Sequence, residues 1–286
     1  MDRLRGVLAR LERVVVAFSG GADSSFLAWV AHDVLGPGGA IAATAVSPSL
    51  AVDELADCRA LAAEWGLNYL EVKTHELDRP EYVANGADRC WHCKDELMGQ
   101  LVPIATARAA RVVLGVNVDD LSDHRPGQSA AMAGGAVFPL VDAGFTKADV
   151  RDASRRLGLR TWDKPAAACL ASRIPYGTAV SLGNLGAVGR AEEGLRRLGF
   201  RALRVRHYGE LARIEIPVDD LELALARRHE VVHAVRSAGY RYVTLDLEGL
   251  RSGNLNDGLV MVAPMPANAA PDAGRGRPVM APQSAR

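Results

Sequence analysis

The chain has 286 residues, and its 34 lysines and arginines balance its 34 aspartates and glutamates. A net charge of zero argues against a protein whose main partner is the phosphate backbone of a nucleic acid. No apolar run approaches the roughly 20 residues that a membrane span needs, so we expect a cytoplasmic protein without a membrane partner.

Apolar strands alternate with helical segments in the first part of the chain. Helices are expected over residues 1–12, 24–35, 53–65, 97–110 and 147–157, and strands over 14–18, 41–46, 69–72 and 112–116. This alternation is typical of an α/β protein with a doubly wound parallel sheet. Such sheets bind ligands at the carboxyl ends of their strands.

The pattern changes after about residue 180. A helix is expected over 188–198, then paired strands over 201–206 and 212–216, a helix over 219–238 and a strand over 240–245. We therefore predict a nucleotide-binding domain over 1–180 and a smaller α+β domain over 181–262, for substrate binding or oligomerisation. Residues 263–286 are rich in Pro, Ala and Gly, and we expect this tail to be disordered.

The sequence Ser-Gly-Gly-Ala-Asp-Ser, residues 19–24, lies between the first strand and the helix that follows it. Small residues let a ligand approach the backbone, and the N-terminus of a helix attracts anions. The hydroxyls of Ser19, Ser24 and Ser25 add donors, which indicates a phosphate site. The loop is neither a Walker A loop nor a Gly-x-Gly-x-x-Gly turn. The simpler alternatives are a glycine turn without a nucleotide, and Asp23 as a helix cap.

This stretch resembles the PP-loop of the ATP pyrophosphatases. The resemblance implies that the loop holds the pyrophosphate of ATP while a substrate attacks the α-phosphate and becomes adenylated. The residues carried over are Ser19, Gly20, Gly21, Asp23, Ser24 and Ser25, with Asp23 near the phosphates and Mg²⁺. The loop by itself leaves several branches of that superfamily open.

The cysteines are Cys58, Cys90, Cys93 and Cys169. Stable disulfides are not expected in a cytosolic chain, and Cys58 is interpreted as core packing. Cys90 and Cys93 form a Cys-x-x-Cys pair, which is also compatible with a redox pair or with a zinc half-site that includes His92. A cation or free backbone donors near Cys169 would lower its pKa and favour the thiolate.

Four stretches together resemble the LarE family, the ATP-dependent sulfur transferases of nickel-pincer cofactor synthesis. They are RCWHCKDEL (89–97), LGVNVDDLSDHRPG (114–127), DKPAAACLASRIPYGT (163–178) and RVRHYGELARIEI (204–216), in the family's order. The resemblance spans about residues 10–262. It implies that ATP adenylates a carboxylate of pyridinium-3,5-biscarboxylic acid mononucleotide, and that sulfur then replaces AMP to give a thiocarboxylate. It also implies a homo-oligomer.

Two sulfur sources exist within this resemblance. In one, the cysteine matching Cys169 gives up its own sulfur and becomes dehydroalanine. In the other, three cysteines hold a 4Fe-4S cluster that transfers an extra sulfide, which a sulfur donor can replenish. Because Cys90, Cys93 and Cys169 match all three cluster positions, we favour the cluster, in which three thiolate ligands leave one iron open.

Several charged residues are candidates for the site. Lys164 would meet the α-phosphate, Arg173 would stabilise the thiolate or the adenylate, and Glu192 would be a functional acid. Alternation on one strand suggests that Arg204 and Arg206 clamp a phosphate, with Arg251 near the same anion. The non-functional alternatives are a surface lysine for Lys164, a solvated helix carboxylate for Glu192 and a solvated strand face for Arg204 and Arg206. Asp120, Asp123 and Arg125 follow the fourth strand and are candidate nucleotide or substrate contacts; His207 and Tyr208 have no assigned role.

Other functions share parts of this pattern. A PP-loop tRNA thiolase also uses a three-cysteine cluster, but the net charge of zero counts against an RNA substrate. An ammonia-dependent NAD synthetase-like enzyme would leave the three cysteines unexplained. An ATP-binding sensor without turnover is disfavoured because the loop, Lys164 and Cys169 are all present.

Overall fold

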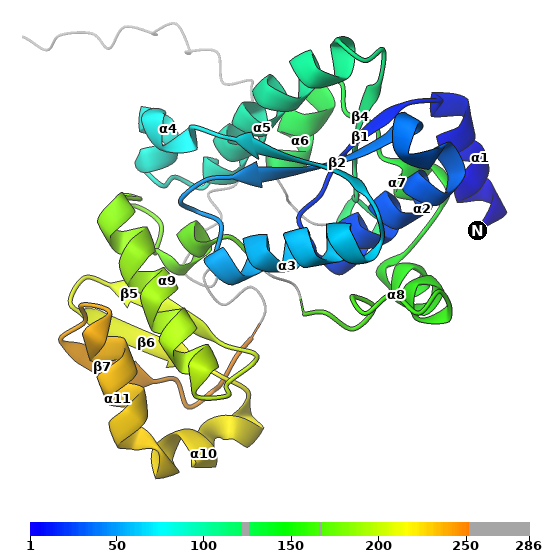
Figure 1. Ribbon diagram of the computed structural model, residues 1–286. Coiled ribbons are helices and arrows are strands. Elements are labelled where there is room, and N and C mark those ends of the chain that lie inside the picture. Colours follow the sequence, from blue (N-terminus) through cyan, green and yellow to red (C-terminus); the bar gives the residue numbers. More distant parts are fainter. Residues whose placement is uncertain (122–125, 166–167, 252–286) are drawn as a thin grey trace, which may run out of the picture. The chain divides into compact units, whose positions relative to one another are not determined.

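The computed structural model describes residues 1–121, 126–165 and 168–251, and within them the chain forms two β-sheets (Figure 1). The first sheet contains β1 (Val14–Ala17), β2 (Ala40–Val46), β3 (Asn68–Lys73) and β4 (Arg111–Leu114). All its pairings are parallel, in the order β3-β2-β1-β4. The parallel α/β sheet that the sequence predicts is therefore confirmed.

Helices cover both faces of this sheet. The α-helices associated with it are α1 (Asp2–Leu11), α2 (Ala22–Gly39), α3 (Val52–Glu64), α4 (Pro80–Val83), α5 (Arg89–Thr106), α6 (Pro126–Ala133), α7 (Pro139–Asp142) and α8 (Lys147–Arg156). Short 3₁₀ helices are η1 (Glu76–Asp78), η2 (Val118–Leu121) and η3 (Leu170–Arg173). In Figure 1, α2 and α3 lie on one side of the sheet and α5 and α6 lie on the other.

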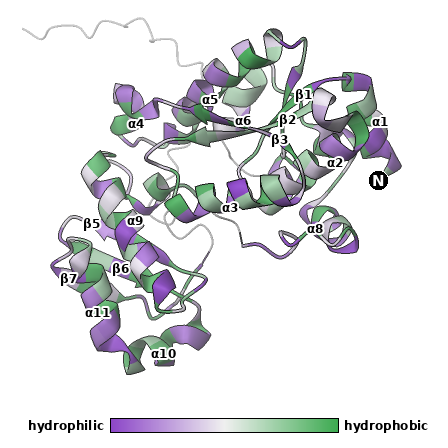
Figure 2. Ribbon diagram, in the orientation of Figure 1, coloured by the Kyte–Doolittle hydropathy of each residue, from purple (hydrophilic) through white to green (hydrophobic). Residues whose placement is uncertain are grey.

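Alternation along β1 explains the two layers. Successive strand residues point to opposite faces, so Val14 and Val16 pack into one hydrophobic core while Val15 packs into the other. The first core includes Phe26 and Leu27 of α2, and hydrophobic residues run along the strands in Figure 2. A strand buried on both faces must be apolar throughout, which is why β1 reads as an unbroken valine run.

The second sheet contains β5 (Arg204–Tyr208), β6 (Leu211–Glu215) and β7 (Tyr242–Leu245), in that order. β5 and β6 are paired, as predicted, and the pairing is antiparallel, while β7 joins β6 in parallel. The helices of this region are α9 (Leu182–Arg197), η4 (Val218–Asp220), α10 (Leu221–Ala226) and α11 (Arg228–Ser237). Residues 1–252 form one compact unit by their contacts, and we keep the division near residue 180 as a proposal.

Two predicted helices differ in the structure. The helix expected over 97–110 begins eight residues earlier, at Arg89, so that Cys90 and Cys93 lie in its first turns. The single helix expected over 219–238 is interrupted at Arg227, whose φ of −99° and ψ of 23° leave the helical region. The tail from residue 263 lies outside the described residues. Among the helices that are described, none is long and apolar enough to cross a membrane.

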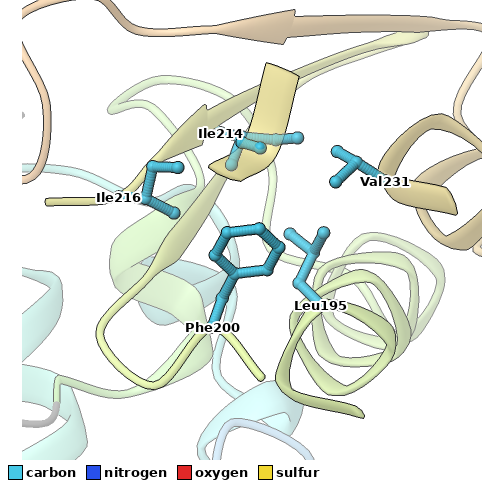
Figure 3. Close-up of a pocket in the computed structure, with 6 residues that line it drawn as sticks. Leu195, Phe200, Ile214, Ile216 and Val231 are labelled. Atoms are coloured by element: carbon cyan, nitrogen blue, oxygen red, sulfur yellow. The ribbon is translucent and has the colours of Figure 1, made fainter. Parts of the chain in front are cut away.

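A small apolar pocket lies inside the hydrophobic core that packs against the second sheet. It is lined by Leu195 of α9, Phe200, Ile214 of β6, Ile216, Ala224 of α10 and Val231 of α11, and Figure 3 shows the labelled side chains pointing toward one another. Binding sites need a few polar groups to orient a ligand, and this lining has none. We therefore assign the pocket to core packing.

Because of His207 in β5, we expect the stability of this region to depend on pH. It is only 7% exposed, and its Nδ1 lies 3.1 Å from the hydroxyl of Tyr240. Burial lowers the pKa of His207 below its ordinary value, so the unfolded chain binds the proton more readily. The free energy of unfolding should therefore fall as the pH drops through about 6.5 toward the lower folded-state pKa.

Urea unfolding of the wild type and of His207→Gln between about pH 8 and about pH 5 checks this prediction. The wild type should lose more stability toward the acidic end than the variant does. His229→Gln, at an exposed position of α11, is the control and should keep the wild-type pH dependence. Equal slopes for wild type and His207→Gln would contradict the prediction.

Candidate active site

The PP-loop connects β1 to α2, with Gly21 as the residue that caps the helix. Gly20 has a φ of 70°, a left-handed conformation that favours glycine. The Ser24 hydroxyl donates to the Gly21 carbonyl (3.1 Å) and accepts from the Ser19 backbone N–H (3.2 Å). The Ser25 hydroxyl is fully buried and has no hydrogen-bond partner among the described residues. The loop is thus held by its own serines, and the Ser25 hydroxyl is buried.

Two close approaches make this loop rigid. A Cβ at Gly20 would lie 2.9 Å from the Cys58 sulfur of α3, and one at Gly115, after β4, would lie 2.8 Å from the Ser24 nitrogen. Only glycine at these positions lets α3 and the end of β4 pack against the loop. Cys58 is 0% exposed, which confirms its interpretation as a packing residue.

Asp23 is not a helix cap. Its Oδ1 accepts from the Asn117 side chain at 3.0 Å, and α2 has no side-chain cap bond. Burial raises the pKa of Asp23, and the nearby Asp120 carboxylate raises it further. Asp120 is 5% exposed and lies 3.0 Å from the Lys147 ammonium. The structure therefore brings two carboxylates together beside the start of α2.

Sequence reasoning missed Asn117 and Lys147. Asn117 lies just beyond β4, at the sheet edge where ligands bind, and that placement was its only signal. Lys147 is the first residue of α8, inside a capping box formed by Thr146 and Asp149, and this box marks the start of the helix but not the role of Lys147. The predicted residues Asp123 and Arg125 lie outside the described residues.

Lys164 is not a solvated surface lysine. It is 18% exposed, and its ammonium donates to Glu54 (2.8 Å) and Asp57 (2.7 Å) of α3. A Cβ at Gly20 would lie 3.7 Å from the same nitrogen. Burial acts to lower the pKa of Lys164, but the hydrogen bonds that its ammonium donates to Asp57 and Glu54 outweigh burial, and the pKa is raised. A permanently charged ammonium therefore lies beside the PP-loop.

Three thiols lie near one another at the start of α5. Cys90 and Cys169 are exposed, and Cys169 caps η3. Burial raises the pKa of Cys93 to about 12, and both other thiols are close enough to contribute. Within the described residues, no group of three or more His, Cys, Asp and Glu side chains is placed to hold a metal ion. His92, the candidate zinc ligand, instead lies 3.2 Å from the Asp88 carboxylate.

A buried cation lies beside these thiols. Arg89 is 3% exposed and donates to the Asn85 side chain (2.7 Å) and the Ala171 carbonyl (2.9 Å). Its second arm points to the Cys90 sulfur at 3.9 Å. No carboxylate of the described residues pairs with Arg89, and Cys169 and Cys90 are among its electrostatic neighbours. The side chains near this cation therefore include thiols, the residue type that ligates iron–sulfur clusters, although among the described residues they are not arranged as a metal-binding group.

Arg173 ties the Cys169 loop to α9. It is bound to Glu192 (2.8 Å) and donates to the Ala168 carbonyl (2.8 Å). Glu192 is 0% exposed and also accepts from Arg196 and from the Val205 backbone N–H, so its interpretation as a solvated carboxylate is wrong. This arginine and this glutamate fix the position of the loop that carries Cys169.

The arginines of β5 have different environments. Arg206 is 3% exposed, forms a double hydrogen bond with Glu215 (3.0 Å each) and donates to the Ser172 carbonyl, so it is not on a solvated face. The Arg204 guanidinium donates a hydrogen bond to the Arg251 carbonyl, and no carboxylate in the described part of the chain pairs with Arg204. Burial, followed by the neighbouring Arg206 and Arg173, lowers the pKa of Arg204. Of the predicted clamp, Arg204 is the guanidinium that remains for an anion.

Gly20→Ala should weaken nucleotide binding. The left-handed backbone costs about 1–2 kcal/mol for alanine. The contact with Cys58 then displaces the loop, which should lower the affinity for ATP at least about tenfold. Gly66→Ala is the matched control, because its φ is 63° but a Cβ there meets nothing within 4 Å.

Both variants should lose stability in urea because of the left-handed backbone, Gly20→Ala more so because of the Cys58 contact, and only Gly20→Ala should lose affinity in titration calorimetry with ATP. Unchanged affinity in Gly20→Ala would show that the loop does not hold the nucleotide.

Comparison with known proteins gives related chains along almost the whole length. An uncharacterized protein of Synechocystis is 46% identical over 259 residues, which cover 90% of this chain and 96% of the relative. An uncharacterized protein of Methanocaldococcus jannaschii is 27% identical over 242 residues, or 84% and 92% of the two chains. No protein-family model matches the chain.

A third relative has a named activity. The pyridinium-3,5-bisthiocarboxylic acid mononucleotide synthase of Lactiplantibacillus plantarum is 38% identical over 257 residues, which cover 90% of this chain and 93% of that enzyme. Identity at this level over nearly all of both chains, together with the PP-loop on a parallel sheet, shows that the chain belongs to the LarE family.

Proposed function

We propose that this chain is an ATP-dependent, AMP-forming sulfur transferase of nickel-pincer cofactor synthesis. Its substrate would be pyridinium-3,5-biscarboxylic acid mononucleotide, and its product the thiocarboxylate. One observation carries the proposal: a PP-loop and a three-thiol centre occur together in a chain 38% identical to a bisthiocarboxylic acid mononucleotide synthase. A tRNA thiolase and an NAD synthetase-like enzyme remain the alternatives, and neither name occurs among these relatives.

ATP would bind with its pyrophosphate on the PP-loop. The N-terminus of α2 and the buried Ser25 hydroxyl provide donors, and the Lys164 ammonium beside Gly20 provides charge. Asp23 and Asp120 would hold Mg²⁺, which neutralises phosphate charge when bound. Magnesium usually takes only one or two carboxylates and completes its shell with phosphate and water, which agrees with the small number of carboxylates here.

Adenylation makes a poor electrophile reactive. A substrate carboxylate oxygen attacks the α-phosphorus, the bond to pyrophosphate breaks, and the bonding electrons leave with pyrophosphate. The carboxylate becomes a mixed anhydride whose leaving group is AMP. Lys164 would stabilise the negative charge that develops at the α-phosphate, because its raised pKa keeps the ammonium charged.

The three thiols would supply the sulfur step. Cys90, Cys93 and Cys169 would ligate a 4Fe-4S cluster, which provides a transferable sulfide when bound, and the buried Arg89 would balance its negative charge. In the alternative route, Cys169 attacks the acyl carbon and AMP leaves. Loss of the Cα proton then breaks the Cβ–S bond, which releases the thiocarboxylate and leaves dehydroalanine.

The substrate phosphate would bind at Arg204, with Arg251 nearby. Arg206, Arg173 and Glu192 would act mainly by holding the Cys169 loop and β5 in place, because each is buried in an ion pair. The family resemblance further supports a homo-oligomer and an external sulfur donor, which we include in the proposal.

The experiment that tests the function uses anaerobically purified chain with ATP, Mg²⁺ and the biscarboxylate mononucleotide. Mass spectrometry should show the replacement of oxygen by sulfur in the small molecule, and Asp23→Ala should release no pyrophosphate. Product counted per chain separates a single-use cysteine from a rechargeable cluster. If neither pyrophosphate nor thio-product forms, this substrate is wrong and tRNA is tested next.

Cys169→Ser should separate the two half-reactions. The variant should release pyrophosphate close to the wild-type rate, because the PP-loop is intact, but should give no detectable thiocarboxylate. Cys58→Ala is the control, since it removes a thiol outside the three-thiol centre and should keep product formation. Full thio-product from Cys169→Ser would remove this cysteine from the mechanism.

A further inference from the structure

Helix α8 (Lys147–Arg156) has two basic residues one turn apart, Lys147 and Arg151, that contact Asp120 and the segment before Lys164. The Lys147 ammonium lies 3.0 Å from Asp120, which is the electrostatic neighbour of Asp23. Arg151, four residues later and thus on the same helix face, donates to two carbonyls of the segment that leads to Lys164. The function proposed above uses Lys164 but assigns nothing to Arg151.

The guanidinium of Arg151 spans a turn of backbone. One arm donates to the Trp162 carbonyl (3.2 Å), and the other donates to the Lys164 carbonyl (3.0 Å). The turn is closed by the Lys164 backbone N–H, which donates to the Thr161 carbonyl at 3.1 Å. Two donors at a fixed spacing are a property of arginine that a lysine ammonium lacks. A single side chain therefore fixes the backbone from which Lys164 projects.

Lys164 is constrained at both ends. Its backbone is held by Arg151, and its ammonium is held by Glu54 and Asp57 beside Gly20. A free lysine side chain has about 2 kcal/mol of rotamer entropy, so an ammonium attached to a mobile backbone would spend little time at one phosphate. Fixing the start of the side chain restricts the places that the ammonium can reach.

We propose that Arg151 is a positioning residue for adenylation, which acts through Lys164 by holding the Trp162–Lys164 backbone against α8. Arg151 does not touch the nucleotide in this proposal. The inference rests on the proposed function, because it assumes that Lys164 acts on the α-phosphate of ATP.

A double-mutant cycle on pyrophosphate release tests it. Arg151→Ala should lower kcat between about 10-fold and about 100-fold, the loss expected when a catalytic group is misplaced, while the KM for ATP changes less than about twofold. Lys164→Ala should lower kcat at least as much. In the Lys164→Ala background, Arg151→Ala should cost less than about a further twofold, because both changes remove the same effect.

Two further variants separate positioning from folding. Arg156→Ala removes an exposed arginine of α8 that pairs with Asp152 (2.8 Å), and should leave kcat unchanged. Arg151→Lys keeps the charge but cannot span two carbonyls, so it should lose activity almost as Arg151→Ala does. If Arg151→Ala fails to unfold cooperatively in urea, the cycle is completed with Arg151→Lys.

The outcomes are distinct. Additive losses in the double variant, wild-type kcat in Arg151→Ala, or full rescue by Arg151→Lys would each overturn the positioning role while leaving the function standing. Wild-type kcat in Lys164→Ala would overturn it as well. A wild-type chain that releases no pyrophosphate would instead reject the proposed function, and the inference with it.

Discussion

The ion pairs of the first turns of α3 are the constraint on which the rest of the site depends. Glu54 and Asp57 bind the Lys164 ammonium beside the PP-loop, and Asp53 binds Arg196, at 3.1 Å. Arg196 in turn binds the buried Glu192, which holds Arg173. Two sets of charged contacts, one to Lys164 beside the PP-loop and one through Arg196 to the loop that carries Cys169, therefore start from neighbouring residues of α3. The first turns of α3 thus contact both the lysine proposed for adenylation and the arginine that leads to the Cys169 loop.

The buried charges fix geometry more than they add stability. Glu192 and Glu215 are both 0% exposed, and each accepts from two arginines. A buried ion pair gains little over apolar packing, but removing one partner costs about 3–5 kcal/mol. The pairs therefore hold the carbonyls of the Cys169 loop and the strand β5 in one arrangement, and they leave Arg204 and Arg89 as cations without a carboxylate partner among the described residues.

Local patterns predicted most of the elements. The valine run of β1 had to be a strand buried on both faces, and the small residues after it had to form the turn into α2. The predicted ends of two helices differ from the observed ends. The helix after the Cys-x-x-Cys pair was expected only from Leu97, although it begins at Arg89 and includes both cysteines. The helix expected over 219–238 is interrupted at Arg227, and no proline or glycine near this position predicts the interruption.

The sequence by itself determined the parallel sheet, the position of the PP-loop and the residue types of the site, because each depends on neighbours a few residues apart. Only the tertiary structure decided which charges meet. Lys164 binds Glu54 across 110 residues, and Asn117 binds Asp23 across 94. No periodicity reports such pairs, so Lys147 and Arg151 carried no sequence signal for their contacts, and Asn117 had only its place after β4. The burial of Glu192 likewise appears only in the folded chain. Burial and distance arise only when the sheet edges and helix ends come together, and they determine which groups those side chains contact.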